Sequence, residues 1–231
     1  MNVLVDFDNL VRDFRRHDLR WVAETVIHSA GPFVPGTRRS IRIRLYGGWY
    51  EQNKPTRLAQ ALMAEIDRDF PALVPVEQRS RRTAVVSAEL AYSLEIEPQN
   101  HIFHTLRTRN NLGSLKGKNE FDCGQAGCPM KTLLGLVSKR KCTVPGCTTQ
   151  LSEVLHRQEQ KLVDSMMLTD LIHLSSQPES TICVVSSDDD LWPGIRFATL
   201  QGANVLHAVN PRKHSARYLA SEPNYKRFAC E

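Results

Sequence analysis

Short apolar segments rich in β-branched residues alternate along the chain with longer segments of helical periodicity. The segments with a strand pattern are residues 2–7, 41–49, 72–77, 181–187 and 204–209. The segments with a helical pattern are residues 18–30, 55–70, 161–176 and 191–202. Strands that alternate with helices are typical of a parallel sheet covered by helices. We therefore expect an α/β fold, in which ligands bind beyond the carboxyl ends of the strands.

Acidic and amide residues stand at the ends of two of the predicted strands. Those after the first strand and after the strand at 181–187 are Asp6, Asp8, Asn9, Asp188, Asp189 and Asp190. Asp8 or Asn9 could instead cap the first helix, and Ser186, Ser187 or Asp188 could cap the helix that starts near Leu191. Carboxylates from distant segments at one end of one sheet favour a bound cation, and hard oxygen ligands suit Mg²⁺ or Mn²⁺.

The helical segment at 161–176 contributes two more aspartates. Asp164 lies near the predicted helix start, and Asp170 follows six residues later. Positions six apart point about 120° away from each other around a helix axis, so the two side chains cannot both face one small site. We expect Asp164 at the metal site and Asp170 either beside it or buried as a structural partner.

Three sequence motifs together resemble those of the NYN domain, a branch of the PIN-like nucleases. VLVDFDNL resembles the first motif, in which an apolar strand is followed by Asp, two residues and Asn. KLVDSMMLTDL is similar to the second motif, and VVSSDDDLWPGI resembles the third, with Ser187 where the family usually has Gly. The resemblance implies a Rossmann-like parallel sheet of the PIN/NYN type flanked by helices. The residues that it implies at the metal site are Asp6, Asn9, Asp164, Asp188 and Asp190, with Asp8, Lys161 and Asp170 beside them.

By this resemblance the protein is expected to be a ribonuclease that hydrolyses RNA phosphodiester bonds through a Mg²⁺ or Mn²⁺ site. Asp6, Asp164 and Asp188 are the implied metal ligands. Asp190 is implied as a ligand or a water-mediated contact, and Asn9 as an orienting donor. In such a site the metal activates a water molecule and stabilises charge on the leaving oxygen. The expected partner is RNA, with single-stranded RNA as the first form to test.

The resemblance covers about residues 1–77 and 159–231 of a domain that spans 1–231, and it leaves 78–158 as an insertion. Within the insertion, residues 123–147 carry two Cys-x4-Cys pairs, each with Gly before the second cysteine. Glycine there permits a tight turn that points N–H groups at sulfur, and four thiolates favour a closed structural Zn²⁺ site. The expected ligands are Cys123, Cys128, Cys142 and Cys147, with His101, His104 and His156 as alternatives.

The segments at 82–96 and 101–109 precede this zinc module, and their apolar content predicts extra strands that carry the insertion away from the sheet. We expect the module to aid binding of the substrate, of a partner protein, or of a second copy in a homodimer.

Composition adds a weak preference for an anionic partner. The net charge is +5, the pI is near 9.0, and basic residues are grouped at 37–44, 78–82 and 137–142. Such groups are either solvated surface or phosphate contacts. No run of about 18 apolar residues is present, and acids stand where a signal peptide would be basic and apolar. We therefore expect a cytoplasmic protein with no membrane partner, whose six cysteines bind metal or remain free thiols.

Two other functions are compatible with parts of the sequence. VDFDN also resembles the start of haloacid-dehalogenase phosphatases, where the first Asp is a covalent nucleophile. Asn9 and Leu10 depart from that pattern, and the helix with Asp164 has no role in it. A catalytically inactive PIN-like protein that binds RNA or docks a partner is the second alternative. Intact acids in all three motifs favour the nuclease.

Overall fold

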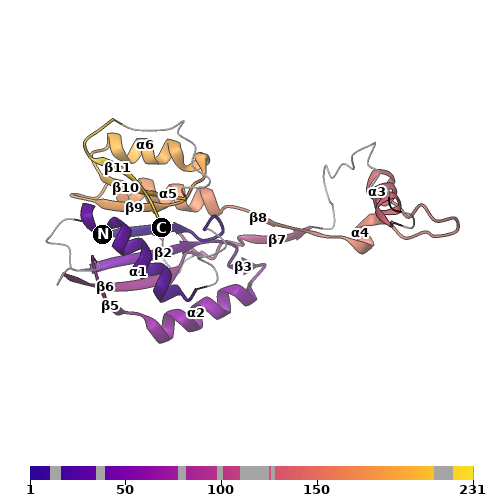
Figure 1. The fold of residues 1–231 in the computed structure, drawn as a ribbon, viewed down its shortest axis with the longest axis horizontal. Coiled ribbons are helices and arrows are strands. Elements are labelled where there is room, and N and C mark those ends of the chain that lie inside the picture. The colour runs from indigo at the N-terminus through magenta and orange to yellow at the C-terminus, as the bar shows by residue number, and fades with distance from the viewer. Residues whose placement is uncertain are drawn as a thin grey trace. The chain divides into compact units, whose positions relative to one another are not determined.

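The computed structural model describes residues 1–10, 17–34, 40–77, 82–97, 101–109, 125, 128–210 and 221–230. These residues belong to two compact units (Figure 1). Unit 1 is formed by Met1–Thr105 and Gln160–Glu231, and unit 2 is formed by Leu106–Glu159. The two segments of unit 1 therefore fold together although unit 2 separates them in the sequence.

Unit 1 contains a seven-stranded sheet in the order β11-β10-β9-β1-β2-β6-β5. Its strands are β1 (Asn2–Asp6), β2 (Ser40–Tyr46), β5 (Ala72–Pro75), β6 (Thr83–Leu90), β9 (Thr181–Val185), β10 (Asn204–Val209) and β11 (Tyr225–Ala229). Neighbouring strands are parallel except for β5, which is antiparallel to β6. The predicted α/β fold with a mostly parallel sheet is confirmed, and all five predicted strands are present. A short antiparallel pair, β3 (Tyr50–Glu51) and β4 (Lys54–Pro55), follows β2.

The helices of unit 1 coincide with the predicted helical segments. They are α1 (Leu19–Ala30), α2 (Arg57–Asp69), α5 (Val163–Ser175) and α6 (Trp192–Leu200), with short 3₁₀ helices η2 (Gly31–Phe33) and η3 (Asp189–Leu191). Asp18 begins α1 by accepting the N–H of Trp21 at 2.8 Å, and Thr56 begins α2 by accepting that of Ala59 at 3.2 Å. After α6, Gly202 has a φ of 90°, which glycine adopts readily at a helix end. No helix in the described ranges is long and apolar enough to cross a membrane.

Both faces of the sheet are covered by helices, as the central strand β1 illustrates (Figure 1). Val3 and Val5 belong to the apolar core that includes α1 and α2, whereas Leu4 belongs to the core that includes α5 and α6. Successive strand residues point to opposite faces, so Asp6 shares the face of Leu4. Its carboxylate is therefore directed toward the side of the sheet that α5 covers.

The position of β6 differs from the sequence prediction. The insertion was predicted over 78–158, with residues 82–96 leading away from the sheet. In the structure, β6 lies between β2 and β5, with Val86 opposite Ile41 of β2. Ala84 and Val86 are buried in the same core as α1 and α2. The strand is thus part of the main sheet, and the separate unit starts at Leu106.

The described residues of unit 2 form little apolar core. The elements of the unit are β7 (Leu106–Arg109), α3 (Met130–Lys139), α4 (Leu151–Val154) and β8 (Arg157–Gln160). The strands β7 and β8 are neighbours, and an ion pair of 2.6 Å joins Arg109 to Glu159. Among the described residues of this unit, Leu151 alone is buried. Few buried apolar residues stabilise a fold only weakly, so a bound metal ion would add to the stability of these residues.

Candidate functional site

Three aspartates from distant parts of the sequence meet at the carboxyl ends of the central strands. Asp6, Asp164 and Asp188 each offer a carboxylate oxygen that lies within 4.8 Å of the others. Asp6 ends β1, Asp164 lies in the first turn of α5, and Asp188 follows β9. Among the described His, Cys, Asp and Glu residues, this is the one group of three or more at that spacing.

Asp6 is held by hydrogen bonds from two neighbouring residues. Its carboxylate accepts the backbone N–H of Asn9 at 3.3 Å and the side-chain amide of Asn9 at 2.6 Å. The hydroxyl of Ser186 donates to it at 2.8 Å. Asp6 is only 2% exposed, so these donors stabilise a charge that is otherwise removed from water.

Asp188 combines the two roles considered for it from the sequence. One of its carboxylate oxygens caps η3 by accepting the N–H of Asp190 at 2.9 Å. Its other oxygen lies 3.5 Å from the amide nitrogen of Asn9, toward the aspartate cluster. The N–H of Asp188 is itself bound by the Ser186 hydroxyl at 3.1 Å. A helix cap and a ligand position are therefore compatible in this residue.

The carboxyl of Asp164 is affected by burial and by the charges of its neighbours. Burial raises the pKa of its carboxyl, and the negative charges of Asp6, Asp188 and Asp190 raise that pKa further. Three carboxylates this close repel one another, and a bound cation would remove the repulsion. Mg²⁺ and Mn²⁺ accept such a set of oxygen donors, so the residues present fit the predicted metal.

The remaining predicted residues lie outside this group of three. The side chains of Asp189 and Asp190 are exposed in η3, although the charge of Asp190 acts on Asp164. Asp8 accepts the N–H of Gly48 at 3.2 Å and thereby joins the end of β1 to the turn after β2. Lys161 is exposed and precedes α5. Its backbone N–H donates to the carbonyl of Thr105 at 3.0 Å.

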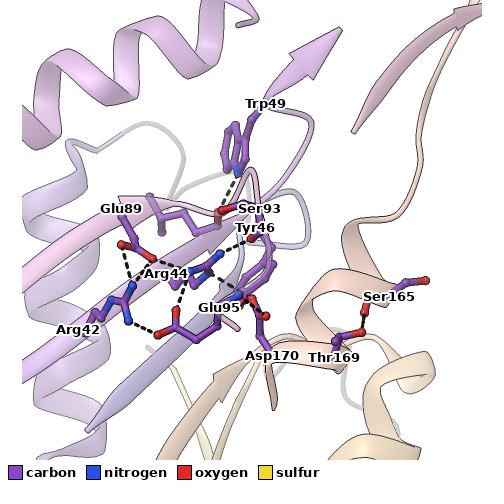
Figure 2. A network of polar contacts seen from close by, with 11 residues as sticks. Arg42, Arg44, Tyr46, Trp49, Glu89, Ser93, Glu95, Ser165, Thr169 and Asp170 are labelled. Atoms are coloured by element: carbon purple, nitrogen blue, oxygen red, sulfur yellow. Dashed lines mark hydrogen bonds and ion pairs between the residues drawn. The ribbon is translucent and has the colours of Figure 1, made fainter. Parts of the chain in front are cut away.

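Asp170 is a buried structural partner, which was one of the two roles expected for it. It is 0% exposed and contacts β2 rather than the aspartate cluster. Its carboxylate accepts the hydroxyl of Tyr46 at 2.7 Å and lies 3.2 Å from the guanidinium of Arg44 (Figure 2).

Two residues next to the cluster were given no role at the site from the sequence, although Ser186 was considered as a helix cap. Ser186 binds both Asp6 and the N–H of Asp188, and it stands in the motif VVSSDDD. Buried His207 lies behind it, with one ring nitrogen 3.0 Å from the Ser186 carbonyl and the other 3.0 Å from the Tyr225 hydroxyl. The one available signal was a polar residue inside the apolar strand segment NVLHAV. That signal does not reveal its partners.

A small cavity adjoins the cluster at the ends of β1, β9 and β10. Its polar lining residues are Asn9, Ser186, Ser187 and Asn210. The cavity volume is about 20 Å³, which is close to the space that one water molecule needs.

Residues 40–44 of the basic group at 37–44 are among the described residues. Arg42 and Arg44 form ion pairs with Glu89 and Glu95 at the β2–β6 side of the sheet. Arg44 is only 4% exposed. Arg44 is therefore committed to these carboxylates rather than to a phosphate contact, whereas the side chain of Arg42 is 39% exposed.

The zinc site stays a prediction, because Cys123 lies outside the described residues. Cys128 and Cys142 are partly buried and Cys147 is exposed, all as free thiols. The N–H of Cys142 donates to the Thr149 carbonyl at 2.8 Å, and the N–H of Cys147 donates to the Val144 carbonyl at 3.1 Å. Hydrogen bonds with Thr149 and then with Cys142 lower the pKa of the Cys147 thiol, which favours the thiolate that a metal needs.

Gly146 has a φ of 81° in this turn, a conformation that L side chains rarely adopt. The tight turn expected from glycine before the second cysteine is therefore present around Cys147. The alternative ligands His101, His104 and His156 are exposed. His104 lies 3.0 Å from Asn53.

The comparisons with known proteins give no relative. No protein-family model matches the chain, and neither the curated proteins nor the solved structures contain a match.

Proposed function

We propose that the protein is a metal-dependent ribonuclease that hydrolyses RNA phosphodiester bonds at the aspartate cluster. The observation that carries the proposal is the convergence of Asp6, Asp164 and Asp188 from three separate segments to within 4.8 Å. Their position at the carboxyl ends of parallel strands is where ligands bind in open α/β sheets. The same three motifs carry the resemblance to NYN-domain nucleases.

Asp6, Asp164 and Asp188 would hold Mg²⁺ or Mn²⁺. When bound, such an ion lowers the pKa of a water molecule and stabilises charge on phosphate oxygens. The protein's own contribution is orientation. Asn9 donates at 2.6 Å to Asp6 and lies 3.5 Å from Asp188, so one amide fixes two of the carboxylates. Asp190 lies near these three aspartates, and together the four carboxylates would repel RNA. Their negative charge must therefore be offset before a phosphate approaches.

Asp190 and Lys161 have supporting roles in the proposal. Asp190 is exposed at the rim of the cluster, close enough for its charge to affect Asp164. We assign it a water-mediated contact with the metal ion. Lys161 is exposed three residues before Asp164, and its cationic side chain is assigned to a substrate phosphate.

The phosphatase alternative receives less support from the geometry. It gives no role to α5, yet Asp164 of α5 completes the group of three. It also requires Asp6 as a nucleophile, whereas both oxygens of Asp6 accept hydrogen bonds from Asn9 or Ser186. These contacts favour a carboxylate that is held in place as a ligand.

For unit 2 we propose a structural Zn²⁺ bound by Cys123, Cys128, Cys142 and Cys147. The assignment is supported by the turn at Gly146 and by the small apolar core among the described residues of the unit. The unit then presents Lys139, Arg140 and Lys141, which are exposed, to RNA or to a protein partner.

The test is incubation of purified protein with end-labelled single-stranded RNA in Mg²⁺, in Mn²⁺ or in chelator, with single-stranded DNA of the same sequence as a comparison. Cleavage of RNA that needs a divalent ion and stops on chelation is the expected result. Cleavage that is unaffected by chelator, or RNA that stays intact with each metal, would refute the proposal.

A further inference from the structure

The carboxylate of Asp170 lies inside unit 1 and is bound from three directions. The Tyr46 hydroxyl donates to one of its oxygens at 2.7 Å, and the N–H of Glu95 donates to the other at 2.7 Å. The Nε of Arg44 lies 3.2 Å from the carboxylate. Asp170 comes from α5, whereas all three partners come from β2 or the segment after β6 (Figure 2). These contacts therefore attach α5 to the sheet.

The partners of Asp170 are themselves fixed by a wider network. Arg44 pairs with Glu89 at 2.8 Å and with Glu95 at 2.6 Å, and it also donates to the carbonyl of Ser93. Arg42 pairs with Glu89 at 2.9 Å and also with Glu95. Arg44 and Asp170 are buried members of this network, and Glu95 is partly buried. Buried charges are costly to separate, because a carboxylate left without its partner stays away from water. The network is therefore a stiff support for Asp170.

Tyr46 connects this network to the aspartate cluster. Its backbone lies opposite Asp6 in the β1–β2 register, and its carbonyl accepts the N–H of Phe7 at 2.9 Å. Its side chain reaches Asp170 on α5. One residue thus contacts the strand end that carries Asp6 and the helix that carries Asp164.

The start of α5 is attached less extensively, by a 3.0 Å hydrogen bond from the N–H of Lys161 to the Thr105 carbonyl. No side chain caps the helix, and Leu162 before it has a φ of 70°, an unfavourable conformation for leucine. Asp164 lies in this first turn and is repelled by the neighbouring aspartates. Packing of Val163, Met166 and Met167 is non-directional, whereas hydrogen bonds restrict both distance and angle. Asp170 lies about 9 Å along the axis from Asp164, close enough to set the position of that turn.

We propose that Tyr46 and Asp170 are positioning residues for the metal site. Their hydrogen bond fixes α5 along its axis against β2 and keeps Asp164 at a distance from Asp6 at which both can bind one cation. The inference rests on the metal site of the proposed function. It adds that the geometry of this site is controlled by a buried contact that does not touch the metal.

The test is the variant Tyr46→Phe, which removes one hydroxyl and keeps the ring. Metal-free wild type and variant are titrated with Mn²⁺ by calorimetry, and their melting temperatures are compared. Substitutions that act on a site through a chain of contacts typically change its affinity by about 2- to 30-fold, so we expect a Kd for Mn²⁺ at least about twofold higher in the variant. Asp170→Asn keeps the side-chain size and one acceptor oxygen, and we expect it to weaken Mn²⁺ binding as well.

The matched control is Ser175→Ala. Ser175 is a buried residue at the end of α5, and its hydroxyl donates at 2.8 Å to the carbonyl of Ile172 in the same helix. We expect a lower melting temperature and an unchanged Kd for Mn²⁺. If folded Tyr46→Phe and Asp170→Asn both bind Mn²⁺ like the wild type, the positioning role is refuted. A wild type that binds no Mn²⁺ would refute the metal site and this inference together, whereas one that binds Mn²⁺ and leaves RNA intact would refute the nuclease activity alone.

Discussion

The Ser186 hydroxyl donates a 2.8 Å hydrogen bond to Asp6, although the two residues are 180 positions apart in the sequence. The same oxygen accepts the N–H of Asp188 at 3.1 Å. Ser186 thus joins the ends of β1 and β9 and orients two of the clustered aspartates. Neither contact requires a substrate, so the arrangement of these carboxylates is part of the fold.

Ser186→Ala should destabilise the protein by about 1 to 3 kcal/mol, because buried hydrogen-bonding partners are left unsatisfied. It should also weaken Mn²⁺ binding, since Asp6 loses one of its orienting donors. Urea unfolding and calorimetric titration would measure the two effects. Thr199→Val is the control, because this buried hydroxyl donates only to Ile195 of its own helix at 2.8 Å. Equal Mn²⁺ affinity in Ser186→Ala and the wild type would contradict the expected role.

The three consecutive aspartates should differ in their effect on RNA cleavage. Asp188→Asn should reduce the rate by at least about 100-fold, because it removes a charged metal ligand and keeps the shape. Asp189→Asn should cleave at nearly the wild-type rate, since Asp189 is exposed and outside the cluster. Asp190→Asn should fall between them. Rates at saturating Mg²⁺ provide the measurement, and a fully active Asp188→Asn would argue against the nuclease assignment.

Asp164→Asn should raise the melting temperature of the metal-free protein at neutral pH. The folded-state pKa of Asp164 is raised, so the stability linked to this group is present below its unfolded pKa and is lost as pH rises through the folded pKa. Asparagine carries no charge, so the variant does not lose this stability as the pH rises. At acidic pH both side chains are neutral, and the two melting temperatures should converge.

Mn²⁺ should reverse this order at neutral pH, because an ion that binds only the folded wild type stabilises it. Melting curves between about pH 4 and about pH 8, with and without Mn²⁺, separate the two effects. Identical melting temperatures in metal-free solution at neutral pH would mean that the aspartates do not repel Asp164 measurably.

Cys142→Ser should release zinc and make unit 2 sensitive to protease. Its stability is expected to come largely from the ion, because Leu151 alone is buried among the described residues of the unit. Elemental analysis should find about one zinc per wild-type chain and much less in the variant. Cys183→Ala is the control, since Cys183 is a buried residue of β9 and no predicted ligand. A zinc-free wild type with a protease-resistant unit 2 would reject the zinc site.

Most of the fold could be predicted from local sequence patterns. The strands β1, β9 and β10 are continuous apolar segments, because both of their faces are buried. The strand β11 was not predicted, since its sequence YKRFA includes two adjacent cations. The strand β6 was recognised as extended but assigned to the insertion, because its residues alternate between exposed and buried and give no sign of the strand they pair with.

Only those parts of the candidate site that belong to sequence motifs could be predicted. Asp6, Asp164 and Asp188 each follow a recognisable pattern, so their meeting was expected. The partner of Tyr46 was not, because Asp170 lies 124 residues away. Arg42 and Arg44 are two residues apart in the strand SIRIRLY and therefore share one of its faces. Nothing in the local sequence indicated that acidic side chains pack against this face. Pairs of this kind depend on tertiary packing.

The strand order has a consequence for biosynthesis. Asp6 ends a central strand that pairs with β2 on one side and with β9 on the other, and β9 begins only at Thr181. While a ribosome has yet to reach that residue, one edge of β1 has no partner and Asp188 does not exist. The nascent chain therefore cannot assemble the aspartate cluster until unit 2 and α5 have already been made. Any activity of this site could begin only after the ribosome has passed Asp188.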